Sequence, residues 1–118
     1  MNYHFVWCPK YRKDILVGMI GKRLKELLVK KSTELNSKII SLEIMLDHVH
    51  VFLECMPTIA PNRIVAGLKG YTSRILRQEF SELRTRMPTL WTRSYFVSTH
   101  GHVSAETIKK YIDKQRGK

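Results

Sequence analysis

Two histidines, His48 and His50, stand one residue apart in the apolar stretch MLDHVHVFLE, residues 45 to 54. In an extended strand successive side chains alternate between faces, so both imidazoles point to one face while Val49 and Val51 point to the other. Two imidazoles on one face can bind a single metal ion, or they can be polar groups on the solvated side of a sheet. The elements around this strand decide between the two interpretations.

Hydrophobic periodicity and turn residues predict those elements. Strands are expected at residues 2–8, 38–45 and 48–55, and around Tyr95 to Ser98. Helices are expected from Ile20 to about Leu35, from Pro61 to about Leu83 and, after the N-cap Ser104, from Ala105 to about Arg116. The order β-α-β-β-α-β plus one helix predicts an α+β, ferredoxin-like (RRM-like) antiparallel sheet with two helices on one face.

The length of 118 residues is that of one domain, and we expect a single domain over 1–118 with its last helix at about 104–116. Hydrophobic residues make up 43% of the chain, which excludes a disordered class, and no apolar run approaches the roughly 20 residues that span a bilayer. The N-terminus lacks a secretory signal pattern, so we expect a cytoplasmic protein. Cys8 and Cys55 lack metal-ligand spacing and are expected to be reduced core thiols.

The charge of the chain indicates a polyanionic partner. Lys and Arg number 21 against 10 Asp and Glu, a formal net charge of +11. Nucleic acid fits best, because neutralising phosphates with Lys and Arg supplies most of the non-specific affinity for it. A membrane surface is the weaker alternative, since the basic helices also carry the periodicity of a folded domain, and a basic protein without a nucleic-acid role stays open.

The last predicted helix brings a tyrosine and an amide to one face. In ETIKKYIDKQ, Tyr111 and Gln115 are four residues apart and so one turn apart. Two imidazoles and an amide oxygen could hold a divalent ion with positions left open for phosphate oxygens. Tyr111 could then attack a phosphodiester, and because the unperturbed pKa of a tyrosine phenol is about 10, a polarised phosphate and the lysines of this helix would have to assist.

Each of these features has a plainer interpretation. A His-X-His pair on an exposed strand is often ordinary, and a tyrosine on an amphipathic helix is usually at the edge of the core. His100 and His102 form a rival histidine pair, but they flank Gly101 in a predicted loop, where strand geometry does not place them together. Gly101 is better explained as a hinge that lets the last helix pack on its own domain or on a partner's.

Single-stranded or hairpin DNA needs a basic groove with exposed rings for stacking. The candidates are basic and aromatic residues after the first strand and on the second helix, namely Lys10, Tyr11, Arg12, Lys13, Arg74 and Arg77. The alternative for each of them is a solvated surface.

Five motifs, in order and at compatible spacing, resemble one family: WCPKYR, DHVHVF, KGYTSRIL, LWTRSYFVSTHG and ETIKKYIDKQ. They are similar to the single-tyrosine HUH transposases of small bacterial and archaeal insertion sequences of the two-hundred type, including the REP-associated tyrosine transposases. The resemblance spans nearly the whole chain.

The resemblance implies a homodimer that cuts and joins single-stranded DNA beside subterminal imperfect hairpins. His48 and His50 match the metal-binding histidines, Gln115 the helix-borne third ligand, and Tyr111 the nucleophile. The implied ion is Mg²⁺ or Mn²⁺, and the implied product is a 5′-phosphotyrosine with a free 3′-hydroxyl. In many members the tyrosine helix completes the site of the other subunit, which agrees with a hinge at Gly101.

Other functions remain open at this point. A related HUH enzyme that nicks single strands for replication or plasmid transfer would use the same residues. A non-catalytic single-stranded nucleic-acid-binding module on this fold would carry paired aromatic residues on its central strands, where this chain has histidines. A small basic interaction protein would leave His48, His50, Tyr111 and Gln115 without a common purpose.

Overall fold

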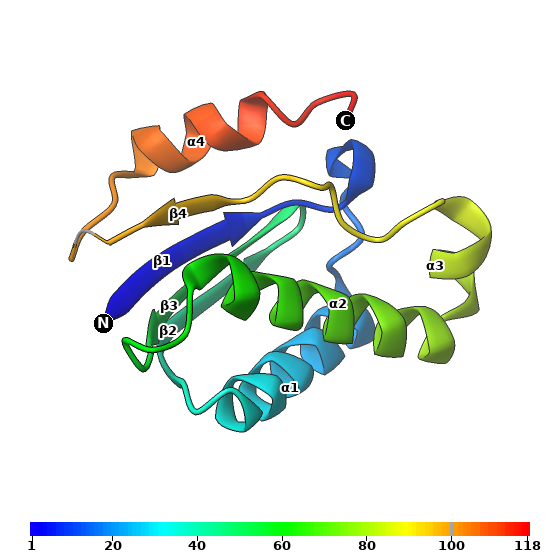
Figure 1. Ribbon diagram of the computed structural model, residues 1–118. Coiled ribbons are helices and arrows are strands. Elements are labelled where there is room, and N and C mark those ends of the chain that lie inside the picture. Colours follow the sequence, from blue (N-terminus) through cyan, green and yellow to red (C-terminus); the bar gives the residue numbers. More distant parts are fainter. Residues whose placement is uncertain (100) are drawn as a thin grey trace.

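The computed structural model describes residues 1–99 and 101–118, and its sheet has helices on both faces (Figure 1). The strands are β1 (Asn2–Trp7), β2 (Lys38–Met45), β3 (His48–Glu54) and β4 (Phe96–Ser98). All neighbouring strands are antiparallel, in the order β2-β3-β1-β4. Helices α1 (Gly18–Glu34) and α2 (Pro61–Glu79) cover one face, and α4 (Ala105–Asp113) lies along the other (Figure 1). The short helices η1 (Lys10–Arg12) and α3 (Ser81–Arg86) lie in connections.

This arrangement confirms the predicted ferredoxin-like α+β fold. The hairpin of β2 and β3 is antiparallel, with a shift in register between Ile39 and Ser41. At the start of α4, the Ser104 hydroxyl accepts a hydrogen bond from the backbone N–H of Thr107, as predicted for an N-cap. The helix ends at Asp113 rather than near Arg116.

The second predicted helix is two helices. Its hydrophobic period continues to Leu83, but α2 ends at Glu79 and Phe80 takes an extended conformation before α3 begins. The Arg84 guanidinium donates hydrogen bonds to the carbonyl oxygens of Arg77 and Gln78, which lie in the last turn of α2. A side chain from the next helix therefore satisfies carbonyls that the helix end leaves free. Periodicity does not reveal such a contact.

Successive side chains of β3 point to opposite faces of the sheet, as predicted. Val49, Val51 and Leu53 are fully buried in the core under α1 and α2, whereas His48 and His50 are partly exposed on the opposite face. On that face Val6 and Cys8 form a second apolar cluster with Ile112 of α4. The docking of α4 is therefore apolar at its centre and is bordered by the histidines.

Both cysteines are free and buried, as predicted, and burial raises the pKa of Cys8 to about 12. A thiol with so high a pKa stays protonated and unreactive at neutral pH. None of the helices in the described part of the chain is long and apolar enough to cross a membrane.

Truncating the core should cost far more than truncating the surface. Leu24 of α1 is fully buried, and Leu24→Ala should lower the free energy of unfolding by about 2–5 kcal/mol. The matched control is Leu46→Ala in the turn before β3, where Leu46 is 52% exposed and the change should be about 0.5 kcal/mol or less. Urea unfolding of both variants checks this, and equal losses would contradict the assigned core.

Candidate active site

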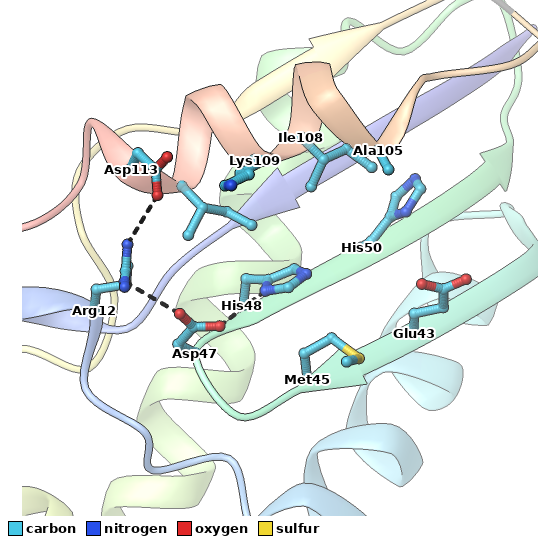
Figure 2. A pocket seen from close by; sticks show the side chains of 11 residues that line it. Arg12, Glu43, Met45, Asp47, His48, His50, Ala105, Ile108, Lys109 and Asp113 are labelled. Carbon is cyan, nitrogen blue, oxygen red and sulfur yellow. Dashed lines mark hydrogen bonds and ion pairs between the residues drawn. The ribbon is translucent and has the colours of Figure 1, made fainter.

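A cleft of about 390 Å³ opens between the histidine face of the sheet and α4 (Figure 2). We call it the histidine cleft. Its floor and one side come from the sheet and the nearby loops, and its other side comes from α4. The lining residues are Arg12, Glu43, Met45, Asp47, His48, His50, Ala105, Ile108, Lys109, Ile112 and Asp113. The last helix thus lies beside the two histidines.

The two imidazoles have different partners. His48 Nδ1 lies 3.0 Å from the Asp47 carboxylate, so a proton on Nδ1 is donated to Asp47 and Nε2 keeps a free lone pair. His50 Nε2 lies 2.9 Å from Nδ1 of His4 on β1. Burial, and next the charge of His4, lower the pKa of His50. A neutral imidazole is the form that can bind a metal ion.

Arg12 connects the cleft wall to α4. Its guanidinium lies 3.1 Å from Asp47 and 3.2 Å from Asp113, as the dashed lines in Figure 2 show. Tyr11 and Arg12 both have positive φ, 61° and 53°, a conformation that costs free energy in residues other than glycine. The strained loop directs the Arg12 side chain inward, and a continuous chain of contacts runs from Asp113 through Arg12 and Asp47 to His48.

Tyr111 and Gln115 do not lie in this cleft. The Ser94 hydroxyl donates a hydrogen bond to Gln115 Oε1 at 2.7 Å, and Tyr111 Oη lies 3.0 Å from the same Ser94 oxygen. Because Ser94 has one proton to give, Tyr111 is the donor in the second bond. At 3.6 residues per turn, Tyr111 lies about 200° around the helix from Lys109 and Asp113, which face the cleft. The described chain therefore holds Tyr111 and Gln115 together but apart from His48 and His50.

Lys69 of α2 supports the segment that binds Tyr111. Its ammonium donates hydrogen bonds to the carbonyl oxygens of Thr92 (2.7 Å) and Ser94 (3.0 Å). Burial lowers the pKa of Lys69 to about 8. Burial also raises the pKa of Tyr111 above its ordinary value. In this conformation Tyr111 is a neutral phenol at neutral pH.

The donor set fits a divalent ion in part. Two imidazoles line one open cleft, and His48 has a carboxylate on one of its ring nitrogens, as metal-binding histidines usually do. Within residues 1–99 and 101–118, no group of three or more His, Cys, Asp or Glu side chains is placed to hold an ion. One chain in this conformation thus offers two nitrogen donors to an ion, and any further ligand would have to come from outside the cleft.

The predicted DNA-binding residues lie on two sides of the molecule. Tyr11 and Lys13 are exposed in the loop beside the histidine cleft, with Lys10, whereas Arg12 is held by its two carboxylates. Arg74 and Arg77 are on α2, on the opposite face of the sheet, and Arg77 donates a hydrogen bond to the Met87 carbonyl. Of the rival histidine pair, His100 lies outside the described residues and His102 is exposed.

Several residues of this region were not predicted to take part. Asp47 directly precedes His48, so DHVH carried a signal for it, and Glu43 faces His50 across the β2–β3 register. His4, Ser94 and Lys69 carried no local signal, because they reach the site only through the pairing of strands and loops far apart in sequence.

Comparison with known proteins places the chain among transposases. Residues 1–115 match the family described as "Transposase IS200 like". The chain is 33% identical to the ISDra2 transposase TnpA of Deinococcus radiodurans, over 100% of this chain and 86% of that protein. It is also 33% identical to the transposase for insertion sequence element IS200 of Salmonella typhimurium, over 97% of this chain and 76% of that protein.

Two solved structures are similar as well. A crystal structure of a transposase from Deinococcus radiodurans R1 has a TM-score of 0.92 at 31% identity, covering 98% of this chain and 91% of that chain. The REP-associated tyrosine transposase bound to a REP hairpin has a TM-score of 0.61 at 11% identity, covering 95% of this chain and 62% of that chain. The second likeness is one of fold alone.

Because burial raises the pKa of Tyr111, its phenol should ionise late in an alkaline titration. Subtracting the absorbance titration of Tyr111→Phe from that of the unchanged protein should leave one phenol with a midpoint above pH 10. Because folding favours the neutral phenol, its contribution to stability is present below the unfolded pKa and is lost as pH rises through the folded pKa. A midpoint at or below 10 would contradict the buried, hydrogen-bonded position.

Proposed function

The chain belongs to the IS200-like transposase family, and from this we propose that it cuts and rejoins single-stranded DNA with Tyr111 as the nucleophile. The observation that carries the proposal is the make-up of α4. One side of this helix forms a wall of the histidine cleft, and another side presents Tyr111 with Gln115 beside it. A candidate nucleophile and a candidate ligand thus lie together on α4 and the turn after it, and the same helix borders the cleft that holds the other two candidate ligands.

In the proposed site His48, His50 and Gln115 hold a divalent ion, Mg²⁺ or Mn²⁺. The ion, when bound, supplies a Lewis acid that withdraws charge from a phosphate oxygen. The Tyr111 oxygen forms a bond to phosphorus as its proton leaves, and the bond from phosphorus to the 3′-oxygen breaks as that oxygen gains a proton. The products are a 5′-phosphotyrosine and a free 3′-hydroxyl, and reversal of the step rejoins strands without ATP.

We propose that two chains assemble this site. Tyr111 and Gln115 are bound by Ser94 in their own chain and face away from their own histidines. In a homodimer, α4 of one chain brings both residues to the histidine cleft of the other. Gly101, in the connection before α4, could act as the hinge for this movement. It is exposed, and its present conformation does not require glycine, so the flexibility of glycine is available for another conformation of the connection.

The proposed DNA is a single strand carrying a hairpin. Support comes from the net charge of +11 and from the loop of Lys10, Tyr11 and Lys13, which offers two cations and an exposed ring beside the histidine cleft. The REP-associated tyrosine transposase, a neighbour in fold, is bound to a REP hairpin. Arg74 and Arg77 would contact a second stretch of the same strand across the helical layer.

The proposal predicts a covalent protein–DNA adduct. Labelled single-stranded DNA from the ends of the chain's own genomic locus, incubated with protein and Mg²⁺ or Mn²⁺, should give a band that survives boiling in detergent. Tyr111→Phe should remove the adduct because the nucleophile is gone, and His50→Ala should remove it because a ligand is gone.

Tyr71→Phe on α2 is the matched control and should keep the adduct, since Tyr71 lies in the helical layer beside Lys31 and Arg74. If the protein binds DNA tightly but forms no adduct with either strand and with either ion, the catalytic proposal is ruled out and the single-strand binding module is favoured. An adduct that persists in Tyr111→Phe would assign another nucleophile.

A further inference from the structure

His4 is a buried histidine that the proposed reaction does not use. It lies on β1 with 7% of its surface exposed, and its ring stacks on Phe52 with centroids 4.0 Å apart and planes 9° apart. Both ring nitrogens have partners. Nδ1 lies 2.9 Å from His50 Nε2, and Nε2 lies 3.4 Å from the carbonyl oxygen of Gly101.

When both rings are neutral, these two contacts determine which nitrogens carry the protons. A carbonyl oxygen only accepts hydrogen bonds, so His4 Nε2 must carry a proton and donate it to Gly101. In a neutral His4 the other nitrogen, Nδ1, then has a lone pair and accepts. The donor in the contact with His50 is therefore His50 Nε2, and the lone pair of His50 is on Nδ1.

We propose that His4 is a positioning residue that holds the proton on His50 Nε2 and leaves Nδ1 as the nitrogen that binds the metal ion. This inference rests on the proposed function, because it takes His50 as a metal ligand. Hydrogen bonds from the outer nitrogen of a ligating histidine set its tautomer and its ring orientation, and losing one commonly weakens metal binding.

A hydrogen bond to a neighbouring residue also sets the tautomer of His48, and here the neighbour is Asp47. Asp47 accepts the Nδ1 proton of His48 and leaves Nε2 free. The two histidines of the motif therefore present different nitrogens, Nε2 from His48 and Nδ1 from His50. A sequence motif of two histidines does not specify this asymmetry, because it comes from one residue on β1 and one in the turn before β3.

The contact with Gly101 anchors His4 from the other side. Gly101 precedes α4, so the carbonyl that accepts the hydrogen bond from His4 belongs to the connection that leads into the helix of Tyr111. The stack on Phe52 fixes the plane of the ring, and the two hydrogen bonds fix its rotation within that plane. His4 is thus held by three contacts, two from β3 and one from the connection before α4, and its own position determines that of the His50 ring.

Two substitutions separate this role from simple packing. His4→Phe keeps an aromatic ring against Phe52 and loses both hydrogen bonds. His4→Asn loses the ring but can place its amide oxygen near the position of Nδ1, where it accepts the proton of His50 Nε2. Thermal unfolding of both variants reports whether each still folds.

The first readout needs no metal and no activity. Long-range proton–nitrogen NMR of the ¹⁵N-labelled, metal-free full chain identifies the protonated nitrogen of each histidine, with His50→Gln assigning the His50 signals. We expect the proton of His50 on Nε2 in the unchanged protein and in His4→Asn, and a mixture of tautomers in His4→Phe. A proton on Nδ1 of His50 in the unchanged protein would overturn the inference.

The second readout is Mn²⁺ affinity, measured by the electron paramagnetic resonance of free Mn²⁺. His4→Phe should bind the ion roughly 10- to 100-fold more weakly, and His4→Asn should recover most of the loss. If His48→Ala abolishes binding while His4→Phe leaves it unchanged, the inference fails and the proposed metal site stands. If binding is the same in His48→Ala as in the unchanged protein, the proposed site fails, and this inference fails with it.

Discussion

The burial of alternate residues on β3 is the constraint on which the site depends. Val49, Val51 and Leu53 have no exposed surface, and moving the strand by one position would expose all three and bury the histidines instead. The apolar side chains therefore hold His48 and His50 on the opposite face, at the edge of a cleft. Antiparallel pairing with β1 and β2 then places His4 and Glu43 beside His50. The register of the sheet thus sets the chemistry of the cleft before any ligand is present.

Different sides of helix α4 make apolar and polar contacts with the rest of its own chain. Ile112 packs into the apolar cluster with Val6 and Cys8 and docks the helix on its own sheet. In that position Asp113 is paired with Arg12, and Tyr111 is bound to Ser94. These polar contacts are few and partly exposed, so each is worth about 1 kcal/mol or less. A helix held by one small apolar cluster and a few such bonds can leave its own sheet for that of a partner chain at low free-energy cost.

Much of the fold followed from sequence because its causes are local. Period-two and helical spacing located the strands and the two long helices, and Ser104 marked the start of α4. The break at Phe80 was missed because Arg84, and not periodicity, satisfies the end of α2. The histidine face was predicted correctly for the same local reason. The position of Tyr111 relative to it depends on Ser94 and on helix docking, which are long-range contacts without a sequence signal.

Because Tyr111 lies apart from the histidines of its own chain, we propose that each active site is built by two chains. The direct test mixes two inactive variants, Tyr111→Phe and His50→Ala, and assays adduct formation with single-stranded DNA. Shared sites predict recovery to roughly a quarter of the activity of the unchanged protein, because half of the dimers are mixed and each mixed dimer carries one intact site of two. No recovery after the subunits have demonstrably exchanged would contradict the account and place Tyr111 and the histidines of one chain in the same site.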